Sequence, residues 1–166
     1  MKKKILILGI SGFLGYHLAK KCLNLNWRVY GVSKSKPKKI RYLKKINYIH
    51  FDLSKRRNFK KLNQLSFDAV VNLSGYVEHK NLNLINKGHF ETVKNLLSYF
   101  KKKKIKSFIQ IGSSAEYGDL KAPHFERSFC KPRGKYGKSK LKSTRYLLGE
   151  KNFPVTILRL YQVYGP

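Results

Sequence analysis

The chain has 166 residues, enough for one domain with a sizeable core, since a domain of about 150 residues buries roughly 70% of its unfolded surface. Its 42% hydrophobic and 13% aromatic content excludes a disordered chain. The balance of 37 Lys and Arg against 8 Asp and Glu, a net charge of +29, would attract nucleic acid, anionic membranes or phosphorylated ligands. The cations are dispersed along the chain, however, which favours solvated surface lysines over a specific nucleic-acid partner.

The first residues, Met1–Lys4 followed by Ile5–Leu8, resemble the start of a signal peptide, but the apolar run is short and no cleavage site follows. No segment approaches the ~20 apolar residues of a membrane span. Cys22 and Cys130 show neither CxxC nor metal-ligand spacing. We therefore predict a soluble, cytoplasmic protein with reduced thiols, no metal site and no membrane partner.

Short apolar runs alternate with longer amphipathic stretches, a pattern typical of a parallel sheet flanked by helices. We predict a single α/β domain, residues 1–166, with a doubly wound parallel sheet. The predicted strands are Ile5–Leu8, Trp27–Val32, Tyr48–Phe51, Asp68–Leu73, Ser107–Ile111 and Val155–Leu160. The predicted helices are Gly12–Asn24, Asn83–Phe100 and Tyr136–Leu148.

A glycine-rich loop follows the first strand. Glycines let the backbone approach a pyrophosphate, and the amino end of the next helix supplies unpaired N–H groups. This placement predicts a dinucleotide-binding Rossmann loop, in which the cofactor contacts come from Gly9, Gly12, Phe13, Leu14 and Gly15.

The end of the second strand carries Ser33 and Lys34, where a carboxylate for the ribose hydroxyls of NAD is expected. A hydroxyl and an ammonium suit a 2′-phosphate, which favours NADP, with NAD as the alternative. Lys34 could equally be one more surface lysine. Asp52, after the third strand, could accept a hydrogen bond from the adenine amino group or cap a helix.

Tyr136 and Lys140 are four residues apart and share one face of the last predicted helix. A tyrosine with a pKa near 10 is a poor base, and a neighbouring ammonium stabilises its phenolate. Ser113 follows the fifth strand, at the edge where open α/β sheets place reacting groups. The three residues predict the catalytic group of a hydride-transferring oxidoreductase, with Tyr136 as the general acid/base.

Taken together, these motifs resemble the extended short-chain dehydrogenase/reductase family, in its NAD(P)-dependent sugar-nucleotide epimerase/dehydratase branch. The resemblance covers essentially the whole chain. It rests on Gly9–Gly15, Asp52–Leu53, Asn72–Gly75, Ser113–Gly118, Tyr136–Lys140 and Leu158–Pro166.

The resemblance implies that Tyr136 removes a proton from a sugar hydroxyl while hydride moves to the nicotinamide, and that Lys140 also holds the nicotinamide ribose. It implies a nucleotide-sugar substrate, a possible homodimer formed through a helical bundle, and further site residues. These are Leu53, Leu73, Ser74 and Gly75 for the cofactor, and Ser114 and Gln162 for the substrate.

Three positions depart from the family pattern. Ala115 replaces the acidic residue of the dehydratases, and Glu116 should point to the other side if the backbone is extended, which leaves a reductase or an epimerase. Gln162 and Gly88 stand where the family has asparagines, so substrate contacts at position 162 and one supporting polar contact at position 88 are in doubt.

The resemblance also implies that a smaller carboxyl-terminal substrate domain ordinarily follows Pro166. We therefore expect this chain to be the dinucleotide-binding domain, which binds NADP but turns over sugar nucleotides slowly or not at all. A catalytically inactive dinucleotide-binding module left by truncation is the alternative.

Overall fold

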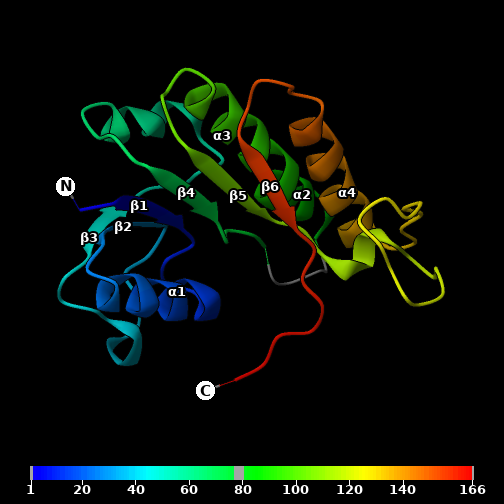
Figure 1. The fold of residues 1–166 in the computed structure, drawn as a ribbon, viewed down its shortest axis with the longest axis horizontal. Helices are drawn as coiled ribbons and strands as arrows, with labels where there is room; N and C mark the ends of the chain where they lie inside the picture. Colours follow the sequence, from blue (N-terminus) through cyan, green and yellow to red (C-terminus); the bar gives the residue numbers. More distant parts are fainter. Residues whose placement is uncertain (1, 77–80, 166) are drawn as a thin grey trace.

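The computed structural model describes residues 2–76 and 81–165 and contains one six-stranded parallel sheet in the order β3-β2-β1-β4-β5-β6 (Figure 1). This arrangement confirms the predicted doubly wound sheet of a single α/β domain. Pro166, the last residue of the predicted motif, lies outside the described residues. The strands are β1 (Lys4–Leu8), β2 (Arg28–Ser33), β3 (Asn47–His50), β4 (Ala69–Asn72), β5 (Ser107–Ile111) and β6 (Val155–Leu158).

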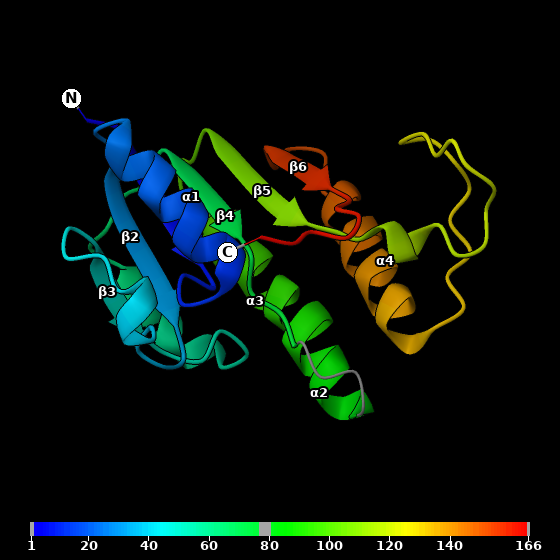
Figure 2. The same cartoon turned by 90° about the horizontal axis from the view of Figure 1, so that it is seen from below.

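Helices cover both faces of the sheet (Figures 1 and 2). The helix α1 (Phe13–Asn24) lies on one face, and α2 (Leu82–Asn86), α3 (Thr92–Phe100) and α4 (Lys135–Leu148) lie on the other. The strand order reverses between β1 and β4, which opens a crevice at their carboxyl ends. Three short 3-10 segments were not predicted: η1 (Lys39–Arg41), η2 (Arg56–Leu62) and η4 (Ser114–Glu116).

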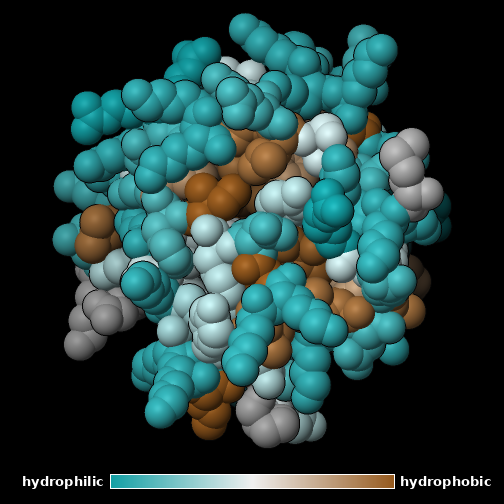
Figure 3. Space-filling view, turned by 90° about the vertical axis from the view of Figure 1, so that its left-hand side faces the viewer, coloured by the Kyte–Doolittle hydropathy of each residue, from teal (hydrophilic) through white to brown (hydrophobic). Residues whose placement is uncertain are grey.

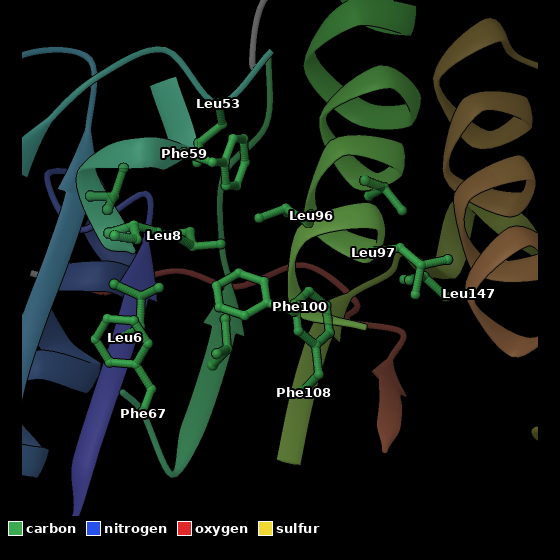
Figure 4. Close-up of a cluster of buried hydrophobic side chains, with 14 of the residues drawn as sticks. Leu6, Leu8, Leu53, Phe59, Phe67, Leu96, Leu97, Phe100, Phe108 and Leu147 are labelled. Carbon is green, nitrogen blue, oxygen red and sulfur yellow. The ribbon is translucent and has the colours of Figure 1, made fainter. Parts of the chain in front are cut away.

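The core has two layers because the side chains of a strand alternate between the two faces. Ile5 and Ile7 of β1 pack in the cluster beneath α1, whereas Leu6 and Leu8 belong to the larger cluster beneath α3 and α4. Figure 4 shows this larger cluster, in which Phe100 of α3 contacts Phe108 of β5, with ring centroids 6.0 Å apart. The rigid core fixes the strand ends that carry the candidate site.

The predicted helix over residues 83–100 is divided by one π-helical turn, η3 (Lys87–Glu91), between α2 and α3. The Thr92 hydroxyl donates to the Lys87 carbonyl five residues earlier, at 3.0 Å. Both His89 and Phe90 are buried, because the wider turn directs two consecutive side chains inward. Such turns are frequent at functional sites.

The surface is mostly hydrophilic, and smaller hydrophobic areas appear between long hydrophilic side chains on the face in Figure 3. Lys34 and Lys106, which pair with Asp52 and Asp68, keep 70% and 84% of their side chains exposed. Among the described residues, no helix combines the length and hydropathy needed to cross a lipid bilayer.

Candidate active site

A cleft of about 400 Å³ lies at the carboxyl ends of β1, β2 and β4, where the strand order reverses. Nine of the predicted cofactor residues line it: Gly9, Gly12, Ser33, Lys34, Asp52, Leu53, Leu73, Ser74 and Gly75. Sequence reasoning missed further lining residues, among them Ser11, Phe51, Ser54, Tyr76, Lys87, Gly88 and Thr92. Phe13, Leu14, Gly15 and the three predicted catalytic residues are not part of this lining.

The glycine-rich loop forms the floor of the cleft. Gly9 has φ +84°, and a Cβ there would lie 2.9 Å from both the Leu73 carbonyl carbon and the Ser74 nitrogen. Only glycine adopts this backbone and permits the close approach of the loop after β4. Gly12 is the N-cap of α1 and has no side chain to cap the helix, so the first amides of α1 are available to an anion.

The ends of β2 and β3 meet in a polar cluster on the cleft wall. Lys34 Nζ lies 3.3 Å from Asp52 Oδ2, and Asp52 Oδ1 accepts hydrogen bonds from the Ser54 nitrogen and hydroxyl, at 2.9 and 2.8 Å. Burial acts to raise the pKa of Asp52, but the Ser54 hydrogen bonds and the Lys34 charge outweigh it, and the pKa lies below its ordinary value. Asp52 therefore both caps a turn and presents a carboxylate to the cleft. The Ser33 hydroxyl donates to the Ser35 carbonyl at 2.6 Å.

Two glycine–aromatic pairs interlock the loop after β4 with the π turn. A Cβ on Gly75 would lie 2.8 Å from His89 Cε1, and a Cβ on Gly88 would lie 2.8 Å from Tyr76 Cβ. His89 Nε2 also lies 3.2 Å from the Tyr76 carbonyl oxygen. Gly88, where the resemblance leads us to expect an asparagine, thus makes room for Tyr76, a residue that was not predicted from the sequence.

The predicted catalytic residue Tyr136 packs against His89 of the π turn. The His89 ring contacts the Tyr136 ring edge-on, with centroids 5.3 Å apart. His89 is buried, and Tyr136 at the start of α4 is half-buried. The loop after β4 and the amino end of α4 are therefore connected through one imidazole.

Lys140 is buried, and its Nζ lies 5.8 Å from the centre of the Tyr136 ring. Nζ donates a 2.9 Å hydrogen bond to the Ile111 carbonyl at the end of β5. Burial lowers the pKa of Lys140 from 10.5 to about 8, against the opposing charge of Glu116. The structure thus brings Tyr136 and Lys140 together as predicted.

Ser113 stands at the N-cap of η4, directly after β5. Its hydroxyl accepts a hydrogen bond from the Ala115 nitrogen at 3.2 Å, and Glu116 Oε1 accepts one from the Ser113 nitrogen at 2.9 Å. The carbonyl that holds Lys140 is two residues away, so Ser113 and Lys140 are anchored at the same strand end.

Glu116 does not lie on an extended backbone, so the predicted reason for its direction is wrong. Residues 114–116 form the 3-10 turn η4, which turns the Glu116 side chain into the core with no exposed surface. There, Oε2 accepts a 3.0 Å hydrogen bond from Arg159 Nε. Arg159 also donates to the Tyr117 hydroxyl and the Glu126 carbonyl. Ala115, at the position of the dehydratase acid, is exposed.

The two predicted substrate residues differ in their surroundings. The Ser114 nitrogen donates to the Leu160 carbonyl at 2.9 Å, which fixes the segment after β6 beside η4. Gln162 lies farther along that segment and is exposed; it makes no hydrogen bond to another described residue. Within residues 2–76 and 81–165, no cluster of three or more His, Cys, Asp or Glu side chains could hold a metal ion.

A family model described as the NAD dependent epimerase/dehydratase family matches residues 5–166. No curated protein matches the chain. Similar solved structures include the UDP-glucuronic acid 4-epimerase of Bacillus cereus in complex with UDP-glucuronic acid and NAD, with 24% identity and a TM-score of 0.84 over 98% of this chain and 58% of that one.

Two further structures are similar. The UDP-Glc/GlcNAc 4-epimerase of Campylobacter jejuni is 26% identical, with a TM-score of 0.84 over 95% of this chain and 53% of that one. The Bordetella bronchiseptica enzyme WbmG, in complex with NAD, is 20% identical, with a TM-score of 0.90 over 100% of this chain and 55% of that one. The chain thus spans little more than half the length of these proteins.

Replacing Lys140 by Met should stabilise the fold at neutral pH. A pKa lowered from 10.5 to about 8 corresponds to a penalty of the order of 3 kcal/mol for the buried ammonium, so urea unfolding at pH 7 should show a gain of about 1–3 kcal/mol. The gain should be complete below pH 8 and shrink between pH 8 and 10.5, where the folded state releases its proton first. Lys138→Met, at an exposed position of the same helix, is the control; an equal gain there would contradict this account.

The change Gly88→Asn, to the residue that the resemblance leads us to expect, should destabilise the domain by about 1–3 kcal/mol, because the new Cβ would lie 2.8 Å from the Tyr76 Cβ. Thermal unfolding measures the effect. Gly134→Asn is the matched control, since no atom lies within 4 Å of a Cβ there and Asn is a favourable residue at this N-cap position of α4. A Gly88→Asn protein as stable as the control would show that Tyr76 does not need this space.

Proposed function

The chain belongs to the NAD-dependent epimerase/dehydratase family, and we propose that its domain binds a nicotinamide dinucleotide and supplies the acid/base group for hydride transfer on a nucleotide-linked sugar. The observation that carries the proposal is the buried ammonium of Lys140, held at the end of β5 and 5.8 Å from the ring of Tyr136. Burying a charged lysine in a core is costly, so a pairing of this kind favours a chemical role over a structural one.

The residues of the cleft fit a dinucleotide. Gly9 brings the backbone of the first loop against Leu73 and Ser74, and Gly12 leaves the first amides of α1 for a pyrophosphate. Asp52 and Lys34 stand on the wall that would receive the adenosine. The bound dinucleotide supplies a nicotinamide ring that accepts a hydride from a sugar carbon or returns it.

Tyr136 takes the proton of the sugar hydroxyl while the adjacent carbon loses its hydride, so that an alcohol becomes a ketone and the phenolate becomes a phenol. Lys140 lowers the energy of the phenolate through its charge. The Ser113 hydroxyl, at the same end of β5 that holds Lys140, orients the reacting oxygen. One proton and one hydride leave the sugar, and both can return in the reverse step.

Epimerisation or reduction is favoured over dehydration. Elimination of water needs a further carboxyl group beside the sugar, and the position that would carry it is Ala115. The neighbouring Glu116 is fully buried and paired with Arg159, so it is not available to protonate a leaving group.

The substrate class is supported by the relatives, since the Bacillus cereus structure contains UDP-glucuronic acid. We propose that Ser114 and Gln162 contribute to binding the sugar nucleotide, together with a second, substrate-binding domain outside these 166 residues. A homodimer formed through a helical bundle is also part of the proposal. A dinucleotide-binding module without chemistry is the competing function, because it needs only the cleft.

The change Tyr136→Phe separates the two functions. Mixing the chain with NAD or NADP and a panel of UDP-sugars should reduce the nicotinamide slowly, and Tyr136→Phe should lower that rate by at least about 100-fold, because the proton acceptor is lost. The dissociation constant of the dinucleotide, measured by calorimetry, should stay within about threefold. Dinucleotide binding without any nicotinamide reduction by the unaltered chain would favour the module.

We also propose that NADP is preferred over NAD, because Ser33 and Lys34 stand where a carboxylate would repel a 2′-phosphate. The similar structures contain NAD, and Lys34 is paired with Asp52. The preference is therefore tested by the ratio of the dissociation constants of NADP and NAD. Lys34→Ala should weaken NADP by about 5- to 20-fold and NAD by less than about twofold. Lys36→Ala, an exposed neighbour, is the control; tighter binding of NAD by the unaltered chain would overturn the preference.

A further inference from the structure

Two buried amides lie side by side in the middle of the sheet. Asn72, the last residue of β4, and Gln110 of β5 occupy paired positions of adjacent parallel strands, and their exposed fractions are 1% and 3%. Asn72 Nδ2 donates a 2.8 Å hydrogen bond to Gln110 Oε1. A strand of this kind ordinarily buries apolar side chains, and a buried amide is tolerated only where all its polar atoms are paired.

The orientation of both amides is fixed by their neighbours. Asn72 Oδ1 accepts from the nitrogen and hydroxyl of Ser74, which leaves Nδ2 to face Gln110. Gln110 Nε2 in turn donates to the Ile111 carbonyl at 3.0 Å. If either amide were flipped, two of its contacts would join donor to donor or acceptor to acceptor. Only one orientation of the two amides therefore pairs every donor in this row of hydrogen bonds with an acceptor.

One end of the row lies at Lys140. The Ile111 carbonyl accepts from Gln110 Nε2 and from Lys140 Nζ at 2.9 Å, which occupies both of its lone pairs. The two nitrogens therefore lie at most about 6 Å apart, the sum of the two distances. An ammonium has three donors, so two remain for groups that enter the site.

The other end lies in the cleft. Ser74, which holds Asn72, is part of the loop after β4 and lines the wall that would receive the dinucleotide. The hydrogen-bonded row thus runs from a cofactor-lining serine, through two buried amides, to the carbonyl that holds the lysine.

We propose that Gln110, held by Asn72, is a positioning residue that fixes the Ile111 carbonyl and through it the ammonium of Lys140, and that it ties this ammonium to the dinucleotide loop at Ser74. Its consequence for hydride transfer rests on the proposed function. The positioning itself is a property of the protein without substrate and can be tested separately.

The decisive variant is Gln110→Glu, which keeps the side-chain length and the acceptor for Asn72 but replaces the donor to Ile111 by a carboxylate. At about 6 Å and an effective dielectric constant of ~20, this carboxylate should increase the proton affinity of Lys140 about 100-fold. The measurement is an NMR titration of the Lys140 side-chain ammonium, assigned by its loss in Lys140→Arg. Glu116 and Tyr136 interact with the ammonium, and Arg159 and His89 contact these two residues; all four are the same in all proteins compared.

A second variant, Gln110→Met, removes the donor without adding charge. It should accelerate hydrogen exchange of the Lys140 ammonium and weaken dinucleotide binding by about 3- to 10-fold, because Ile111 and Ser74 lose their common anchor. Val70→Ala, at a buried position of β4 that is not part of the hydrogen-bonded row, is the control for general loss of stability. It should leave the ammonium signal and its titration unchanged.

An unchanged Lys140 titration in folded Gln110→Glu, or the same change in Val70→Ala, would overturn the positioning role. Failure of the proposed function looks different: the titration would shift as expected, but no UDP-sugar would reduce the nicotinamide in the unaltered chain.

Discussion

The buried ammonium of Lys140 is the constraint around which the candidate site is built. A charge in a protein interior is tolerated only if partners compensate for lost water. Here the compensation comes from the Ile111 carbonyl and from the negative charge of Glu116, which opposes the effect of burial on the lysine. The carboxyl end of β5 is therefore the anchor of both the lysine and Ser113.

Much of the fold could be predicted, because its strands are short apolar runs and its helices follow a 3.6-residue period. The doubly wound parallel sheet was predicted from the alternation of these elements, and the glycine-rich loop from its position after the first strand; the order of the strands comes from the structure. Asp52 was singled out because it directly follows a predicted strand, whereas Ser74 and Gly75 came from the family resemblance; all three line the cleft. Side chains that depend on contacts between distant segments, such as Tyr76 over Gly88, have no such local pattern.

Two local structures that we did not predict, the η4 turn and the π turn, do have recognisable patterns in the sequence. The spacing Ser113-x-x-Glu116 is that of a capping box, which predicts a helical turn and an inward glutamate rather than an extended strand. In the helix predicted over residues 83–100, the buried apolar residues Ile85 and Phe90 are five positions apart instead of the usual three or four. One residue inserted into a helical turn, as in a π turn, produces this spacing. Both deviations from regular secondary structure lie next to the candidate catalytic residues, and functional sites are where such deviations are most often found.

The ion pair between Glu116 and Arg159 joins residues 43 positions apart and has a consequence for dissecting the domain. Every described residue that lines the cleft beside the glycine-rich loop lies between positions 9 and 92, in the first part of the chain. A fragment that stops before Arg159 would nevertheless leave an uncompensated carboxylate in its interior, at a cost of about 3–5 kcal/mol. A piece of the chain that keeps this carboxylate paired must therefore extend well past the last described residue that lines the cleft.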